Sequence, residues 1–203
     1  MYKPSNRIKF LFVVAVIVNG GVFSCFGQSG SAEPSYEATM YVVIGSDDTA
    51  QRGDLPKPLD TVSQRIRDNF TFKNYRLINT YYGRLANSGS LEYKSVSSLK
   101  NVSTELDAPS FLDWQLANFK AEPPATSRNP LSVQIFRFGA RVPIVVSQIP
   151  SGDGKTNPVT NYESVGLTLN KLSIAENTPT LVGTISLPRT TGTVFLILTI
   201  KQV

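Results

Sequence analysis

Apolar residues along most of this chain alternate with polar ones in short runs bounded by glycine, proline, asparagine and serine. Such a pattern is typical of β-strands. The pattern predicts eight strands, at residues 36–44, 75–85, 91–98, 110–121, 132–147, 160–173, 180–187 and 193–202. A short helix is the alternative for 110–121. Within 132–147, Gly139 and Pro143 predict a bend or bulge, because both residue types interrupt a regular strand.

One segment has the periodicity of a helix. Leu59, Val62, Ile66 and Phe70 recur three or four residues apart, and Pro58 suits the first turn. The sequence therefore predicts a helix near residues 59–70.

The order of these segments predicts an α+β fold that is predominantly antiparallel β. Residues 36–98 form a predicted βαββ subdomain. Residues 109–203 form a sandwich-like antiparallel β subdomain. We expect the two to pack together as one unit, because each is small and has apolar strand faces to bury.

The first 27 residues have the layout of a secretory signal peptide. Lys3, Arg7 and Lys9 precede an unbroken apolar run over residues 10–18, which is too short to span a bilayer. Residues 28–35 are small and polar and predict a linker. Cys25 is either discarded by cleavage after Gly27 or is a candidate lipid attachment site, since the residues before it resemble a bacterial lipobox. Lipidation would tether the protein to a membrane.

Composition narrows the function further. The formal net charge of +5 includes three positive residues of the leader, so the remainder is nearly neutral and its basic residues are scattered singly. A nucleic-acid partner is therefore not expected. Cys25 is the only cysteine and histidine is absent, so the exported part has neither thiol nor imidazole for catalysis or metal binding. We expect no enzymatic activity, no cofactor and no metal site.

Several short motifs carry too little context for chemistry. Gly152–Thr156 lacks the first glycine of a phosphate-binding loop, because position 149 is isoleucine, and it is interpreted as a hairpin tip. Ser97–Lys100 has the spacing of a serine–lysine pair but stands at a strand end. Arg52-Gly53-Asp54 is interpreted as turn chemistry. The acidic residues Asp47, Asp48 and Asp54 are interpreted as a solvated loop rather than a cation site.

Two other functions stay open. Exposed tyrosines at Tyr81-Tyr82, or the Arg52 to Asp54 loop, would suit a surface adhesion or carbohydrate-binding module. A hydrolase built from dispersed carboxylates would need two of them to converge in a cleft. Trp114 alternates with apolar neighbours and is expected in the core.

Two C-terminal segments resemble a known family. Tyr162, Val165, Gly166 and Leu169 match a Y-x-x-V-G-x-x-L stretch within 159–174, and residues 195–203 resemble the apolar strand that ends such channel domains. This family is the secretin family of bacterial outer-membrane channels. The resemblance implies a small secretin-related or secretin-associated envelope protein that is not a pore by itself.

These observations predict an exported protein, periplasmic, outer-membrane associated or secreted, that acts through protein–protein contacts, with envelope proteins or with itself. The strand at 193–200 is either a central strand or a docking edge, because an edge strand presents unpaired backbone groups.

Overall fold

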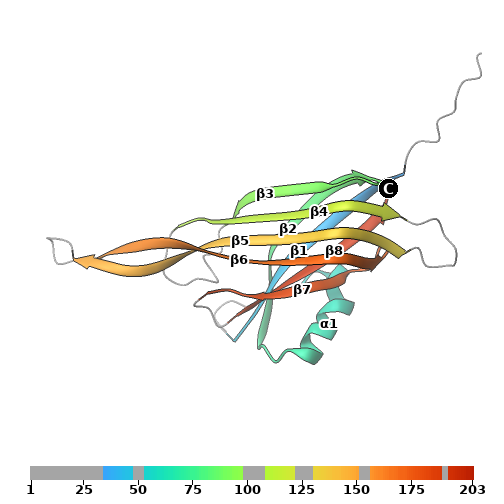
Figure 1. Cartoon of the computed structure of the whole chain (residues 1–203). Coiled ribbons are helices and arrows are strands. Elements are labelled where there is room, and N and C mark those ends of the chain that lie inside the picture. The colour runs from blue at the N-terminus through green and yellow to red at the C-terminus, as the bar shows by residue number, and fades with distance from the viewer. Residues whose placement is uncertain (1–33, 48–52, 98–107, 122–129, 151–155, 189–191) are drawn as a thin grey trace, which may run out of the picture. The chain divides into compact units, whose positions relative to one another are not determined.

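The computed structural model describes residues 34–47, 53–97, 108–121, 130–150, 156–188 and 192–203. Within them the chain forms eight strands, one 3-10 turn and one α-helix (Figure 1). The strands are β1 (Ser35–Ser46), β2 (Asn74–Ala86), β3 (Leu91–Ser97), β4 (Ser110–Ala121), β5 (Pro130–Pro150), β6 (Thr156–Ala175), β7 (Thr180–Ser186) and β8 (Thr193–Gln202). The predicted α+β fold, predominantly antiparallel β, is confirmed.

The strands form two antiparallel sheets. Sheet A has the order β2-β1-β8-β7 and sheet B the order β3-β4-β5-β6. The main core lies between the sheets, and its largest fully buried side chains include those of Trp114, Phe119 and Phe136. Trp114 is therefore a core residue, as predicted. Strand β4 is also confirmed over the helical alternative.

The helix covers the outer face of sheet A. A 3-10 turn at Lys57–Leu59 contains Pro58 and leads into α1 (Asp60–Asn69), whose Val62 and Ile66 are buried. These residues pack with Leu59 against Phe195 and Ile197 in a second, smaller core. The helix predicted near 59–70 is thus confirmed, and its spacing of apolar residues reflects this contact.

Strands β1 and β8 are buried on both faces because sheet A lies between the two cores. In β8, Val194, Leu196 and Leu198 face sheet B, whereas Phe195 and Ile197 face the helix side. The continuous apolar run follows from this double coverage. Strand β8 pairs with both β1 and β7, so it is a central strand and not a docking edge.

In sheet B, the alternation of inward-facing and outward-facing residues shifts by one position at the same level of β4, β5 and β6. In β4 the buried apolar positions are Leu112, Trp114 and Leu116, and then Phe119. In β6 the inward residues Leu167 and Leu169 are followed by Leu172. In both strands the residue just before the shifted inward residue has a positive φ, which is 53° at Asn118 and 58° at Lys171. Because β5 shifts at the same level, the strands stay in register while the sheet kinks.

The bend predicted at Gly139 and Pro143 lies elsewhere. Both residues pair in regular register, with Gly166 and Tyr162, and the register shift occurs between Val145 and Ser147. That prediction was wrong because an extra residue is accommodated where β5 has left β4 and pairs only with β6. Residues 156–159, which precede the strand predicted at 160–173, also belong to β6. The predicted leader and linker up to residue 33, Cys25 included, lie outside the described residues.

Candidate interaction surface

Strands β5 and β6 continue beyond the rest of sheet B as a two-stranded ribbon. Strand β4 pairs with β5 only as far as the Phe111–Arg141 pair. Beyond it, β5 and β6 pair with each other alone, through to Pro150 and Thr156. Figure 1 shows this extension past the ends of β3 and β4. We call residues 142–150 with 156–163 the β5–β6 ribbon.

The ribbon is almost uncharged and partly apolar on its surface. Glu163, at its base, is its single charged residue. Val146 is 49% exposed and Ile149 is 57% exposed. An isolated two-stranded ribbon is marginally stable, even when β-branched residues favour its conformation. Exposed apolar side chains on such a ribbon are typical of a surface that a partner covers.

An aromatic patch lies at the base of the ribbon, on the outer face of sheet B. The guanidinium carbon of Arg141 lies 5.1 Å from the centre of the Phe111 ring. The rings of Phe111 and Tyr162 lie 5.6 Å apart. Val96, which pairs with Phe111 across the strands, is 67% exposed. We call Val96, Phe111, Arg141 and Tyr162 the aromatic patch; an aromatic ring beside an arginine is a frequent composition of binding surfaces.

A cleft of about 370 Å³ adjoins this patch. Its charged lining comes from Lys94, Asp113 and Arg141. Lys94 Nζ lies 2.8 Å from Glu92 Oε1, and this hydrogen bond raises the pKa of Lys94. Beside it Asp113 pairs with Gly139, and the Asp113 carboxylate lies close over this glycine, since a Cβ atom at Gly139 would be 2.7 Å from Asp113 Oδ1. The cleft therefore presents an aromatic wall, two cations and one carboxylate.

The four residues of the Y-x-x-V-G-x-x-L match alternate between the two faces of β6. Tyr162 is 40% exposed and contacts Phe111, and Gly166 is exposed on the same face. Val165 and Leu169 are partly buried against the main core. A Cβ atom at Gly166 would lie 2.8 Å from the carbonyl oxygen of Phe138, so the glycine allows close strand contact. Two of the four residues thus belong to the surface and two to packing.

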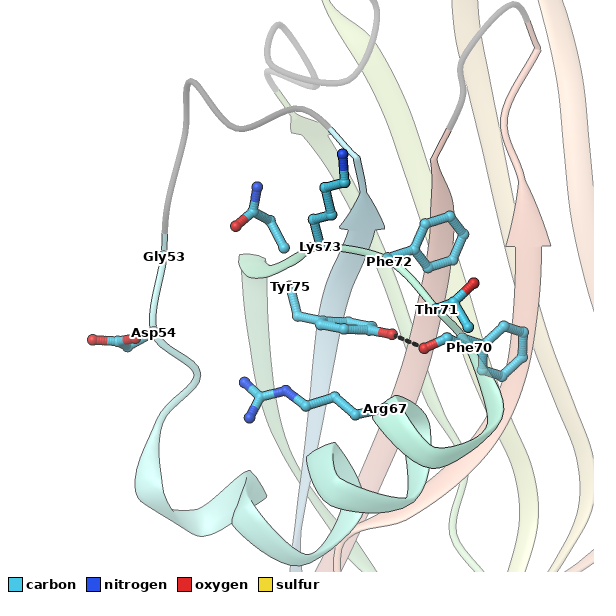
Figure 2. A pocket seen from close by; sticks show the side chains of 9 residues that line it. Gly53, Asp54, Arg67, Phe70, Thr71, Phe72, Lys73 and Tyr75 are labelled. Atoms are coloured by element: carbon cyan, nitrogen blue, oxygen red, sulfur yellow. Dashed lines mark hydrogen bonds between the residues drawn. The ribbon is translucent and has the colours of Figure 1, made fainter.

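A second cleft, of about 400 Å³, lies where α1 ends and β2 begins (Figure 2). The Tyr75 hydroxyl donates a hydrogen bond to the carbonyl of Phe70 at 2.6 Å, and Arg67 lies 5.7 Å from the ring centre of Tyr75. Burial raises the pKa of Tyr75. Asp54 lines the opening, but its carboxylate points away from Arg67 and Tyr75 in Figure 2. The interactions inside this cleft fix the end of the helix.

The described residues of the predicted acidic loop lie around the second cleft. Gly53 and Asp54 line it, and the Asp47 carboxylate accepts a hydrogen bond at 3.1 Å from the backbone of Lys73, which lines it too. Arg52, Asp48, residues 98–100 and residues 152–155 lie outside the described part of the chain. Within that part, no three acidic residues come close enough together to hold a metal ion. Each of the two clefts has one carboxylate in its lining, Asp113 or Asp54.

The tyrosine pair considered for ligand binding is divided between two environments. Tyr81 is buried in the main core, and its hydroxyl lies 3.0 Å from Ser95 Oγ. Tyr82 is 51% exposed and donates a hydrogen bond to Glu37. The aromatic pair that lies together on the outer face of sheet B is Phe111 and Tyr162. These two are 51 positions apart in the sequence, so only the strand pairing brings them together.

Comparison with known proteins gives one weak resemblance. No family model matches the chain, and no curated protein does. Among solved structures, the cryo-EM structure of the V. cholerae type IV competence pilus secretin PilQ is similar, at 10% identity and a TM-score of 0.32. The match covers 84% of this chain and 58% of that one, so this chain spans less than two thirds of the secretin's length. The function therefore has to be inferred from the surfaces of the chain itself.

No helix in the described residues is both long and apolar enough to cross a membrane.

Proposed function

We propose that this chain is an exported cell-envelope protein, without catalytic activity of its own, that acts through protein–protein contacts. The observation that carries the proposal is the β5–β6 ribbon, whose strands continue past the sheet with exposed Val146 and Ile149. A solvated ribbon of this length would ordinarily carry charged side chains, which oppose association. This one has a single charge, at Glu163.

The aromatic patch supports the same proposal. It continues the ribbon at its base, so the two form one surface through Tyr162, which belongs to both. Aromatic residues and arginine are enriched at the centres of protein interfaces because they bury a large area at a small entropic cost. The envelope location rests on the signal-peptide pattern of residues 1–27. We propose a secretion or pilus apparatus as its setting, because two C-terminal segments of the sequence resemble secretins.

The test is affinity capture of the tagged chain from its native envelope, with partners identified by mass spectrometry. A ribbon variant, Val146→Lys with Ile149→Lys, places two charges where a partner would bury apolar groups. The matched control, Thr61→Lys with Gln64→Lys, adds the same charge at exposed positions of α1. We expect an envelope protein to be captured by wild type and control and lost in the ribbon variant. Equal capture by both variants, or no envelope protein at all, would contradict the proposal.

A second candidate function is carbohydrate binding in the cleft beside the aromatic patch. Phe111 there adjoins Lys94, Asp113 and Arg141, and sugars are bound by an aromatic face together with polar groups. Binding of envelope polysaccharide by the purified chain, abolished by Phe111→Ala and unaffected by the ribbon variant, would favour this function over protein contact.

A further inference from the structure

Strand β6 presents the longest unpaired edge of the sandwich. It is the terminal strand of sheet B and runs for 20 residues. The other terminal strands are shorter, with 13 residues in β2 and seven each in β3 and β7. Within the described part of the chain, no strand pairs with the outer edge of β6. Its outward backbone groups are therefore available for pairing with an extended segment.

This edge has few of the features that prevent strand addition. Charged side chains, prolines and bulges ordinarily protect an exposed edge. Between Val159 and Asn170, β6 has no proline and one charge, Glu163. The left-handed φ of 58° at Lys171 marks the end of this regular stretch.

The charges of β6 indicate what pairs with it. Glu163 and Lys171 are its only two charged residues, and they have opposite signs. Neither has an ion-pair partner within the described residues. If a second copy of β6 adds in the antiparallel direction with Leu167 opposite Leu167, each Glu163 comes to the level of the other copy's Lys171, the residue that ends the regular stretch. The strand is thus complementary in charge to itself in this register.

The same register matches the two faces of the strand. Directly opposite residues in an antiparallel pair point to the same side. Val165 then lies opposite Leu169, and both belong to the inward, partly buried side. Ser164 lies opposite Asn170, and both are on the exposed outer side. A shift by one residue would place inward side chains opposite outward ones.

We propose that two copies of this chain associate through their β6 edges, antiparallel and two-fold symmetric about Leu167, so that the two B sheets form one continuous sheet. The inference deepens the proposed function, on which it rests, by naming a second copy as a partner at the strand that forms half of the ribbon. Backbone hydrogen bonds and the joined apolar side supply the affinity. The two Glu163–Lys171 pairs are exposed, so they select the register more than they add binding energy.

Cysteine pairs test the register directly. In a Cys25→Ser background, Ser164→Cys with Asn170→Cys would place two thiols opposite two others across the two-fold axis. Within one chain the two positions are six residues apart on one strand, about 20 Å, which no disulfide can bridge. We expect a covalent dimer on mild oxidation. Each single-cysteine variant, whose thiol faces no other thiol, should form no covalent dimer. Equal cross-linking in a single variant would overturn the register.

Sedimentation equilibrium tests the association and its charge selection. We expect a monomer–dimer equilibrium in the wild type. Glu163→Lys and Lys171→Glu, which each create two like-charge contacts, should each weaken the dimer about tenfold, and the double reversal should restore it. A wild type that is monomeric throughout, or single variants that dimerise normally, would overturn the inference. If an envelope protein is still captured through the ribbon in that case, the proposed function stands and only the self-association fails.

Discussion

Lys201 Nζ lies 2.6 Å from Glu37 Oε2, joining the last strand of the chain to the first. The pairing register explains the contact, because Glu37 lies opposite Lys201 on one side and opposite Arg84 on the other. Arg84 approaches the other carboxylate oxygen at 3.4 Å, and the Tyr82 hydroxyl donates to it. Three neighbouring strands of sheet A are thus connected through one largely buried carboxylate.

This cluster predicts a stability that depends on pH. The hydrogen bonds from Lys201 and then Tyr82 lower the pKa of Glu37 from its ordinary 4.5 to about 2. A lowered pKa in the folded state means that the unfolded chain takes up a proton first. The contribution of Glu37 is therefore complete above pH 4.5 and is lost as the pH falls from about 4.5 toward 2.

The check is urea unfolding followed by the fluorescence of Trp114, the single tryptophan, at pH 6 and at pH 3. The wild type should lose more stability over this interval than Glu37→Gln, whose side chain cannot ionise. Asp68→Asn, at an exposed position of α1, serves as the control and should behave as wild type does. The same pH dependence in wild type and Glu37→Gln would show that this carboxylate does not contribute.

The small core beneath α1 predicts a large effect of one substitution. Phe195 is fully buried, and its ring lies 4.9 Å from that of Phe70 and 5.9 Å from that of Tyr75. Phe195→Ala should lower the free energy of unfolding by about 3–5 kcal/mol, through lost burial and the cavity left behind. In α1, amide hydrogen exchange should become faster. Phe111→Ala removes the same side chain from the half-buried aromatic patch and should cost about 1 kcal/mol. Comparable losses in the two variants would contradict this assignment of the core.

The parts of the fold that depend on neighbouring residues could be predicted from the sequence, and the parts that depend on distant residues could not. Residues 194–200 form a strand because most of their side chains are β-branched or aromatic and all but Thr199 are apolar, which is local information. Whether β8 is central depends on β1, about 150 positions earlier in the chain. The placement of β2 and β3 in different sheets, although a short turn at Ser88 joins them, is also a tertiary outcome.

The surface was the harder part to predict. Residues 142–150 have no charge, and this signal in the sequence could have identified the ribbon. Its exposure could not be inferred, since an apolar run of this kind is also typical of a buried strand. The aromatic patch depends on two strand registers that bring Val96, Phe111 and Arg141 side by side. The kink at Asn118 and Lys171 likewise follows from neighbouring strands that shift together.

The exposed apolar side chains of the β5–β6 ribbon predict that a charge there makes the purified chain less prone to aggregate. Ile149 is 57% exposed in a segment of high β-propensity, which favours association at high concentration. Ile149→Lys should raise the concentration at which the purified chain begins to aggregate, with little effect on the unfolding midpoint. Static light scattering over a concentration series measures the first and urea unfolding the second. Gln64→Lys on α1 adds the same charge and should leave the aggregation threshold nearer to that of wild type. If the aggregation threshold rises equally in both variants, net charge alone explains the effect.

Gly166 predicts a steric effect at the centre of the Y-x-x-V-G-x-x-L match. A Cβ atom there would lie 2.8 Å from the carbonyl oxygen of Phe138, a backbone atom of β5 that cannot rotate away. Gly166→Ala should therefore force β5 and β6 apart locally and destabilise the protein by about 1–3 kcal/mol. Thr168→Ala, on the same exposed face of the same strand, introduces no such contact and should change stability by less than about 0.5 kcal/mol. The unfolding midpoints of the two variants measure this difference in stability. If Gly166→Ala is as stable as Thr168→Ala, the glycine is not required for the close approach of the strands.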